Sequence, residues 1–335
     1  MIRVWFNHWF STAYRLIELM KDDKEEEIHI IGTNLQLDSV IQKVCDEWYE
    51  DSPLTGDEYI SFCLDFCKKH NIDVFVPRRC MTDVSRCKDK FEEIGVKVLV
   101  DDYKAVSLLE NKAATYKFFK DYENIRIPDY FSVTNAVEFE QAYKELRKTC
   151  EQVCVKFVRD EGGMSFRKIS ENVNEFDRLR VYQGTSISYD DLYTALSSKE
   201  SFDELMVMPY MEGNEVSVDC LRTDSGTIAI PRIKSPVRHE RVVYDTEIIS
   251  ATANVLNRLN LQFPCNVQFR YKDGQLYLLE VNTRMSGGLQ MSCLASGVNI
   301  PNIALNKLLG KEIDWSIDDE TDKIVSYIEI PKLIR

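Results

Sequence analysis

Few of the usual signatures of membrane, secreted or zinc-binding proteins occur in this sequence of 335 residues. No apolar run approaches the roughly 20 residues that cross a bilayer, and the first residues lack the basic end and apolar core of a secretory leader. None of the 10 cysteines forms a Cys-x-x-Cys pair, and the 4 histidines are scattered. Zinc sites usually need closer thiol pairs, so we expect free thiols, with redox regulation as the alternative, in a cytoplasmic protein without a membrane partner.

Basic residues are also in the minority. Lys and Arg number 42 against 55 Asp and Glu, which gives a net charge of −13. Nucleic-acid binders draw much of their affinity from cations that neutralise phosphates, so we expect small-molecule partners and no nucleic acid. The length suits two domains or one domain with subdomains, and the 44% hydrophobic content is that of a globular chain.

The first hundred residues alternate short apolar runs with amphipathic stretches, a pattern that predicts a Rossmann-like parallel α/β domain. The expected strands are Ile2–Asn7, Ile28–Thr33, Val74–Pro77 and Val96–Val100. The expected helices are Ser11–Lys21, Asp38–Tyr49, Asp57–His70 and Ser85–Glu93. The first strand leads into Asn7-His8-Trp9 and not into Gly-x-Gly-x-x-Gly, so a dinucleotide fingerprint is absent.

The pattern changes twice after this region. Two helices, Glu110–Asp121 and Asn135–Thr149, precede a mostly antiparallel β region with late helices. Its expected strands are Val153–Val158, Phe166–Ile169, Leu205–Met208, Glu215–Arg222, Thr227–Lys234, Cys265–Tyr271 and Gln275–Val281, followed by helices at Ser292–Ala295 and Pro301–Leu309. Asp273-Gly274 predicts a tight hairpin turn. We expect three structural parts, residues 1–104, 105–206 and 207–335.

The segment Glu280-Val-Asn282-Thr-Arg284 carries the sharpest chemical pattern. Strand alternation places these three polar residues on one face. Two oxygen donors and a guanidinium suit a magnesium–phosphate centre, and Gln268 on the preceding strand could supply a third ligand. A solvated strand face with a chance polar triplet is the alternative.

Two further segments could bind a nucleotide. Lys156 leads into a loop with Gly162-Gly163 and Ser165, where backbone N–H groups could approach phosphate; an ordinary hairpin is the alternative. The extended backbone of Met208–Met211 could offer a carbonyl and an N–H to an adenine edge, and Glu215 could accept from ribose hydroxyls. A hairpin with a surface glutamate would explain the same residues.

In this order, the segments resemble the ATP-grasp superfamily of carboxylate ligases, and most of all the ATP-grasp modules of carbamoyl-phosphate synthetase large chains. The resemblance is carried by Asn266-Val-Gln268-Phe, by Glu280-Val-Asn282-Thr-Arg284 and by residues 295–301, which lead into the last expected helix. It extends over about residues 1–315. It implies a helical and β lid and an antiparallel β catalytic subdomain after the parallel α/β domain. The acidic first hinge residue common in the family is replaced here by Met208.

The resemblance also implies roles for individual residues. Lys112 and Lys156 correspond to the two phosphate lysines, and the loop with Gly162, Gly163 and Ser165 to the flap over the phosphates. The hinge that reads adenine and the ribose ligand correspond to Met208, Tyr210 and Glu215. The metal ligands correspond to Gln268, Glu280 and Asn282, usually for two Mg²⁺ ions with Mn²⁺ as a substitute, and the residue that steadies the γ-phosphate corresponds to Arg284.

The implied reaction activates a carboxylate with ATP as an acyl phosphate, releases ADP and joins the acyl group to an amine. We expect amino-acid or small-metabolite substrates. Arg232 or Lys234 is expected to face the γ-phosphate, and Arg238 to Arg241 to lie in a loop near the acceptor, unless this stretch is a solvated basic loop. A kinase-like or carboxyphosphate-forming enzyme and a nucleotide-binding regulator are the alternatives. A homodimer is compatible with the resemblance.

Overall fold

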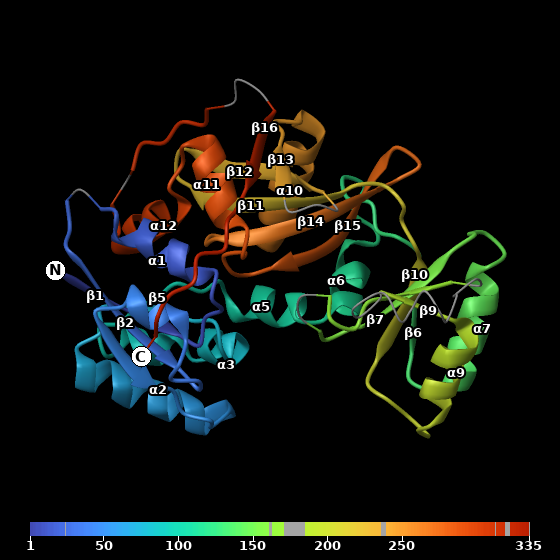
Figure 1. Cartoon of the computed structure of the whole chain (residues 1–335), viewed down its shortest axis with the longest axis horizontal. Helices are drawn as coiled ribbons and strands as arrows, with labels where there is room; N and C mark the ends of the chain where they lie inside the picture. The colour runs from blue at the N-terminus through green and yellow to red at the C-terminus, as the bar shows by residue number, and fades with distance from the viewer. Residues whose placement is uncertain are drawn as a thin grey trace. The chain divides into compact units, whose positions relative to one another are not determined.

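The computed structural model describes residues 1–23, 25–160, 163–170, 185–235, 239–311, 313–318 and 322–334. The chain forms two compact units (Figure 1). Unit 1 contains Met1–Leu109, Asn214–Phe269 and Val281–Arg335, and unit 2 contains Glu110–Gly213 and Arg270–Glu280. The ends of the first long segments, at 109 and 213, lie close to the boundaries expected at 104 and 206. The division into three parts stays a prediction, because the first and last parts pack here as one unit.

Unit 1 contains the expected parallel sheet, with the strand order β3-β2-β1-β4-β5. Its strands are β1 (Ile2–Asn7), β2 (Ile28–Asn34), β3 (Glu47–Glu50), β4 (Val74–Val76) and β5 (Lys97–Val98). The helix α1 (Ala13–Lys21) packs with Val4 and Phe6 on one face. The helix α2 (Gly56–His70) packs with Trp5 and Phe75 on the other. Alternate residues of one strand thus serve two cores, as period-2 geometry requires.

One expected element of this sheet is wrong. The stretch Asp38–Tyr49 is not a helix, because it contains a single 3-10 turn, η1 (Val40–Lys43), followed by strand β3. β3 pairs in parallel with β2, with Glu47 beside Ile31. Its two aromatic residues, Trp48 and Tyr49, favour a strand, and this pairing outweighs the helical spacing of the apolar residues before them. The expected helix Ser85–Glu93 is also divided, into α3 (Met81–Arg86) and α4 (Lys88–Glu92).

Unit 2 is built on a five-stranded sheet with the order β6-β10-β7-β8-β9. Its strands are β6 (Phe131–Val133), β7 (Val153–Phe157), β8 (Arg167–Ile169), β9 (Ser186–Ile187) and β10 (Leu205–Pro209). The helices α7 (Ala136–Leu146) and α9 (Tyr189–Ser197) lie together on one side of the sheet (Figure 1), where Phe139, Leu192 and Val155 share a core. A second core contains Cys154 and Met206 of the sheet and Tyr116 of α6 (Lys112–Phe119).

A six-stranded sheet with the order β15-β14-β11-β12-β13-β16 contains the later strands. They are β11 (Glu215–Thr223), β12 (Gly226–Lys234), β13 (His239–Val242), β14 (Cys265–Lys272), β15 (Gln275–Asn282) and β16 (Lys323–Ser326). The predicted hairpin turn is present: Asp273 and Gly274 both have positive φ, at 50° and 74°, as a two-residue primed turn needs. The helix α10 (Thr246–Leu259) was not expected.

The core of unit 1 joins distant parts of the chain. Its largest buried cluster contains Leu16 and Ile30 from the first fifty residues, Ile230 from β12, and Leu289 and Leu305 from the late helices α11 (Leu289–Ser296) and α12 (Ile300–Leu309). The unit also contains the helix α5 (Tyr103–Leu109). All ten cysteines lie in described parts of the chain and are free thiols, as expected. Among the described residues, no helix has both the length and the apolar content that a membrane span requires.

Candidate functional site

Two predicted phosphate lysines meet one predicted metal ligand within unit 2. Lys112 is the first residue of α6, whose start is fixed by Asn111, because the Asn111 side chain accepts from Ala114 N at 2.8 Å. Lys112 Nζ lies 3.9 Å from Glu280 Oε2. Lys156, on β7, donates from Nζ to the carbonyl of Leu279 at 3.4 Å. The structure therefore brings both lysines to the same end of β15, where Glu280 is only partly buried.

The base of the expected phosphate flap is fixed by hydrogen bonds. Asp160 Oδ2 accepts from Ser165 N at 2.7 Å, and Ser165 Oγ accepts from Phe157 N at 2.9 Å. Lys112 Nζ donates to the Asp160 carbonyl at 2.6 Å. Gly163 has a φ of 68°, which glycine adopts without strain. Gly162, also assigned to the flap, lies outside the described residues.

The expected adenine hinge lies at the end of β10. Met208 is buried and pairs with Cys154 of β7. The main-chain N–H of Tyr210 donates to the carbonyl of Gln152 at 2.8 Å, so this donor already has an acceptor within the fold. The Tyr210 ring lies 4.4 Å from Lys168 Nζ and 5.1 Å from Arg270 Cζ. Neither of these cations was expected to have a role in the site.

In unit 1, the structure brings together two other predicted site residues. Glu215 begins β11, and Lys234 ends β12. The antiparallel register that pairs Val216 with Ile233 places them side by side, and they form an ion pair. Their side chains are 27% and 39% exposed, so solvent screens much of this interaction. Glu215, the expected ribose ligand, and Lys234, expected to face the γ-phosphate, are therefore neighbours in the fold.

Arg232, expected near the γ-phosphate, is instead enclosed by the protein. Its side chain is 2% exposed, and its Nη2 lies 2.9 Å from Asp219 Oδ2. A second ion pair joins it to Glu240, and Nε donates to Ser292 Oγ at 2.9 Å. Burial alone would lower the pKa of this guanidinium, but the two carboxylates raise it above its ordinary value. The guanidinium thus binds Asp219, Glu240 and Ser292 in this structure. The expected direct contact with phosphate is not tested by this arrangement and stays a prediction.

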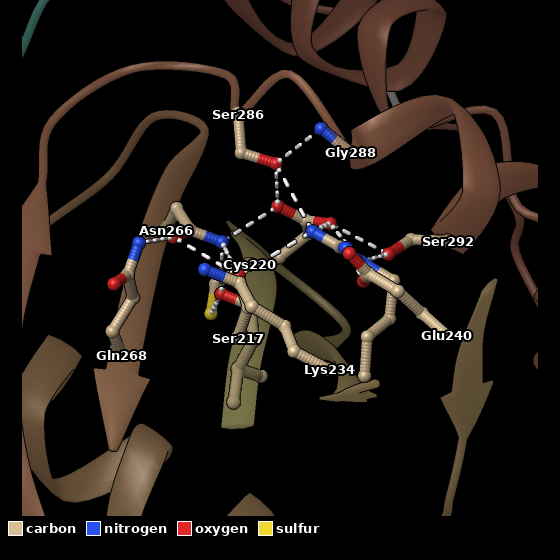
Figure 2. A network of polar contacts seen from close by, with 12 residues as sticks. Ser217, Cys220, Lys234, Glu240, Asn266, Gln268, Ser286, Gly288 and Ser292 are labelled. Carbon is tan, nitrogen blue, oxygen red and sulfur yellow. Dashed lines mark hydrogen bonds and ion pairs between the residues drawn. The ribbon is translucent and has the colours of Figure 1, made fainter. Parts of the chain in front are cut away.

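The network around Arg232 extends to two predicted functional segments (Figure 2). On one side, Asn266 Nδ2 donates to Asp219 Oδ1 at 2.8 Å, and Asn266 Oδ1 accepts from Gln268 Nε2 at 3.2 Å. On the other side, Ser286 Oγ donates to Asp219 Oδ1 at 2.7 Å and accepts from Gly288 N at 3.2 Å. The buried Asp219 thus connects a proposed metal ligand with the turn that follows Arg284.

Gly288 has to be a glycine because of this network. A Cβ atom built on Gly288 would lie 2.4 Å from Arg232 Nη1, well inside van der Waals contact. The neighbouring Gly287 faces the loop after β1, where a Cβ would lie 3.2 Å from Thr12 Oγ1 and 3.7 Å from Phe10 Cε2. The Ser286-Gly-Gly turn therefore packs closely on both sides.

Arg284 also reaches the loop after β1. Its guanidinium carbon lies 5.5 Å from the centre of the Phe10 ring, within the range of a cation–π contact. Asn282 ends β15, and Val281 between the strand's polar residues is buried, as the alternation predicted. Glu280 and Asn282 thus lie on the second strand of the predicted hairpin, as expected.

The basic stretch after β12 differs from the expectation. Residues 239–242 are not in a loop, because they form β13 between β12 and β16. Arg241 pairs with Asp322 at 3.2 Å, and both side chains are exposed. Arg238 lies outside the described residues. Since the described cations of this stretch have acidic neighbours of their own, the run of positive charge in the sequence is largely compensated in the fold.

The proposed metal ligands suit magnesium better than a transition metal. Among the described residues, no three His, Cys, Asp or Glu side chains gather at metal-binding distances. Gln268 and Asn282 offer amide oxygens, and Glu280 offers a carboxylate. Gln268 uses its amide nitrogen to bind Asn266, so its oxygen is the remaining donor atom. Oxygen donors of this kind fit Mg²⁺, which takes few protein ligands and completes its shell with phosphate and water.

Several features of this network were missed because they depend on distant partners. Asp219 could have been found as a carboxylate within the apolar strand Glu215–Thr223, and the pairing of Arg232 with it from the position of this cation within the apolar strand Gly226–Lys234. Two opposite charges in adjacent apolar strands predict a buried pair. Nothing in the local sequence marked Phe10 or Ser292.

Comparisons with known proteins support the resemblance. Residues 201–331 match the family described as "ATP-grasp in the biosynthetic pathway with Ter operon". The carbamoyl phosphate synthase large chain of Thermoanaerobacter sp. (strain X514) is 27% identical over 237 residues, which cover 65% of this chain and 20% of that protein. That of Saccharolobus solfataricus is 27% identical over 242 residues, covering 68% and 21%. The chain thus spans about a fifth of the length of these relatives.

Solved structures match over nearly the whole chain. An N5-carboxyaminoimidazole synthetase from Staphylococcus aureus, complexed with ADP, has a TM-score of 0.70 at 13% identity, covering 96% of this chain and 81% of its own. The biotin carboxylase domain of Hydrogenobacter thermophilus 2-oxoglutarate carboxylase, a dimer in complex with MgADP, ADP and bicarbonate, has a TM-score of 0.67 at 18% identity, covering 95% and 71%. The chain has the ATP-grasp fold, and its resemblance to the ATP-grasp superfamily and to carbamoyl-phosphate synthetase large chains is confirmed.

Proposed function

We propose that this protein is an ATP-dependent carboxylate–amine ligase. It activates a substrate carboxylate as an acyl phosphate, releases ADP and joins the acyl group to an amine of an amino acid or another small metabolite. The observation that carries the proposal is the meeting of Lys112, Lys156 and Glu280 in unit 2, where Lys112 Nζ lies 3.9 Å from Glu280 Oε2. Two cations beside one carboxylate are the groups that phosphate and a phosphate-bound cation require.

The proposed chemistry explains why these groups are needed. A free carboxylate resists attack by an amine because it is negatively charged and has no good leaving group. Phosphorylation removes that charge and provides phosphate as the leaving group. The side chains contribute mainly positioning and charge stabilisation, with Lys112, Lys156 and Arg284 toward the transferring phosphoryl group. Lys234 is proposed for the same role, and Arg232 acts through the turn that it holds.

The nucleotide and metal are assigned to the remaining residues of the motif. Met208 and Tyr210 bind adenine, Glu215 binds ribose, and Gly162, Gly163 and Ser165 cover the phosphates. Gln268, Glu280 and Asn282 would hold Mg²⁺, or Mn²⁺ in its place, which supplies charge neutralisation at the phosphates. A covering loop keeps water from the acyl phosphate, which would otherwise hydrolyse. The flap is held at its base by Asp160 and Ser165.

The test is ADP release from the whole chain with pooled carboxylates and amines, followed by mass spectrometry of the products. ADP release that requires both a carboxylate and an amine is expected. Glu280→Gln should abolish magnesium-dependent turnover without changing the melting temperature. Glu145→Gln serves as the matched control, because the Glu145 side chain is 57% exposed on α7 of the same unit. Normal turnover of Glu280→Gln would refute the metal assignment.

A carboxyphosphate-forming reaction is the second candidate. It is favoured by one observation: the biotin carboxylase domain that shares this fold was solved with bicarbonate and MgADP. ADP release with bicarbonate and no amine would select this reaction. Tight ATP binding without turnover on any substrate pool would select a nucleotide-binding regulator. A cytoplasmic location and a homodimer are also proposed, the latter because the same neighbour is described as a dimer.

A further inference from the structure

A hollow in unit 1 is lined by none of the residues assigned to the nucleotide or the metal. Its volume is about 500 Å³, which is in the range of pockets that hold small molecules. One wall is the polar side of α1 together with Asp22, which follows it. The other wall is the segment 43–46 between η1 and β3. Since Asp46 directly precedes β3, the hollow reaches the amino edge of the parallel sheet.

Ion pairs and a main-chain hydrogen bond fix the two walls. Lys21 Nζ lies 2.9 Å from Asp46 Oδ1 and 3.0 Å from Oδ2, and it therefore joins α1 to the opposite wall. Asp46 Oδ2 also accepts from Ile30 N of β2 at 2.7 Å. On α1 itself, Arg15 Nη1 lies 3.0 Å from Glu18 Oε2. The hollow is therefore a fixed feature of unit 1.

Charged side chains of both signs line the hollow in equal number. They are Arg15, Lys21, Lys43, Glu18, Asp22 and Asp46. Arg15 pairs with Glu18, and Lys21 pairs with Asp46. Within the part of the chain that the structure describes, the exposed side chains of Lys43 and Asp22 take part in no hydrogen bond or ion pair. One positive and one negative group are thus left to bind a ligand.

Two neutral side chains separate Lys43 from Asp46 and line the same hollow. Val44 is 9% exposed and belongs to the core cluster of unit 1, against which the half-buried Cys45 packs. Burial raises the pKa of the Cys45 thiol to about 12, with a further contribution from Asp46. The thiol therefore stays neutral, and this part of the lining favours an apolar group of a ligand.

We propose that this hollow binds a small zwitterion, an amino acid or a short peptide with an apolar side chain. Its carboxylate lies toward Lys43, its ammonium group toward Asp22, and its apolar part on Val44 and Cys45. A ligand of one sign would meet as many like as opposite charges, because the lining has three of each. The proposal does not rest on the proposed function, since the residues assigned to the nucleotide and the metal lie elsewhere.

Direct binding tests the hollow without turnover. Leucine and leucyl-leucine serve as zwitterionic probes in calorimetric titrations of the full chain at low ionic strength, because salt screens exposed charges. Leucine amide keeps only the ammonium group, and N-acetyl-leucine keeps only the carboxylate. Each blocked compound is expected to bind about 2- to 5-fold more weakly than leucine, the size of one exposed ionic contact. The tighter of the two zwitterions distinguishes an amino acid from a peptide as the ligand.

Substitutions in the protein complete the test. Lys43→Gln should weaken leucine about 2- to 5-fold and leave leucine amide unchanged, since that compound has no carboxylate for Lys43. Asp22→Asn should weaken leucine to the same extent and leave N-acetyl-leucine unchanged. The double substitution should weaken leucine about 4- to 25-fold, the product of the two effects. Each variant should keep the melting temperature of the unchanged chain, because both side chains are exposed.

The matched controls are Lys148→Gln and Glu145→Gln in unit 2, which remove charges from side chains that are 67% and 57% exposed. They should leave all affinities unchanged. The proposal is overturned if neither zwitterion binds below about 10 mM, or if the blocked compounds bind as tightly as leucine. Binding that the Lys43 and Asp22 variants leave unchanged would place the ligand elsewhere and would also overturn it.

The same variants separate this proposal from the proposed function. If leucine binds through Lys43 and Asp22 but no carboxylate and amine support ADP release, the ligase assignment fails and the zwitterion site stands. If ADP release requires a carboxylate and an amine while leucine binding ignores both side chains, the zwitterion site is wrong and the ligase assignment stands.

Discussion

Lys112 and Lys156 of unit 2 differ from Arg232 of unit 1 in the groups that bind their charges. Lys112 and Lys156 donate to main-chain carbonyls, and Lys112 has its acidic neighbour Glu280 at 3.9 Å, beyond direct hydrogen-bond distance. Arg232 is enclosed by Asp219 and Glu240, and its side chain is 2% exposed. A guanidinium paired with two buried carboxylates stabilises a scaffold, whereas the proposed phosphate role of the two lysines would require them to exchange carbonyl oxygens for phosphate oxygens.

The largest effect is expected where this scaffold is broken. Arg232→Met leaves Asp219, which is 1% exposed, as an unpaired buried charge. We expect a loss of about 3–5 kcal/mol in the free energy of unfolding, measured by urea denaturation. The double substitution with Asp219→Asn should recover part of that loss. A stable Arg232→Met protein with a raised KM for ATP would show instead that Arg232 contacts the nucleotide.

A loss of activity without a loss of stability is expected for the lysines. Lys156→Ala removes the cation that donates to Leu279, and we expect kcat to fall about 10²- to 10³-fold, as when one donor to a developing charge is removed. The melting temperature should stay close to that of the unchanged chain. Lys148→Ala is the control, because Lys148 is 67% exposed. A large drop in melting temperature would place Lys156 with Arg232 as a scaffold residue.

Asp101 sharpens the comparison because it is a buried charge without an opposite charge bonded to it. Its Oδ1 accepts from Gln262 N at 2.6 Å, but its buried Oδ2 has no hydrogen-bond partner among the described residues. Burial raises the pKa of this carboxyl to about 6. Since the folded-state pKa exceeds the unfolded one, the folded state binds more protons, and ionisation of Asp101 destabilises the fold as the pH rises from about 4 to 6.

The Asp101→Asn variant tests this pH dependence. Relative to the unchanged chain, its free energy of unfolding should increase by on the order of 1–3 kcal/mol between about pH 4 and pH 7. Urea denaturation at several pH values measures the difference. A constant difference between the two proteins would mean that Asp101 titrates normally.

The smallest effect on stability is expected for the ion pair between Glu215 and Lys234. Because both side chains are partly exposed, Glu215→Gln should cost less than about 1 kcal/mol in the free energy of unfolding. The KM for ATP should nevertheless rise if Glu215 binds ribose. A change in stability alone would show that the pair is structural.

Local periodicity was enough to predict much of the fold. β1 (Ile2–Asn7) was predicted with its observed bounds, and the hairpin at Asp273–Gly274 was found from its turn residues. The strand Glu47–Glu50 was missed, because its place is decided by pairing with β2. The helix α10 was missed although its buried residues Ile248, Val255 and Leu259 follow a helical spacing.

The same distinction applies to the candidate site. Lys156 and Glu280 could be found because each lies in a short motif of its own, whereas the burial of Arg232 depends on Asp219, 13 positions away, and Ser292, 60 positions away. The contact of Phe10 with Arg284 joins residues that are 274 positions apart in the sequence. Such long-range contacts have no local signal in a single sequence.

The way in which unit 1 is assembled from distant segments has a consequence for synthesis of the chain. Asp23 accepts from Asn302 and Asn306 at 2.7 Å, and Lys97 donates to the carbonyl of Leu308 at 3.0 Å. The core that contains Leu16 also contains Leu305. During synthesis, the apolar residues of the first hundred positions that belong to this core therefore stay uncovered until the last helices have been made. Most of unit 2 is synthesised before that point. Contacts of such long sequence separation slow folding and leave apolar surface exposed in the meantime.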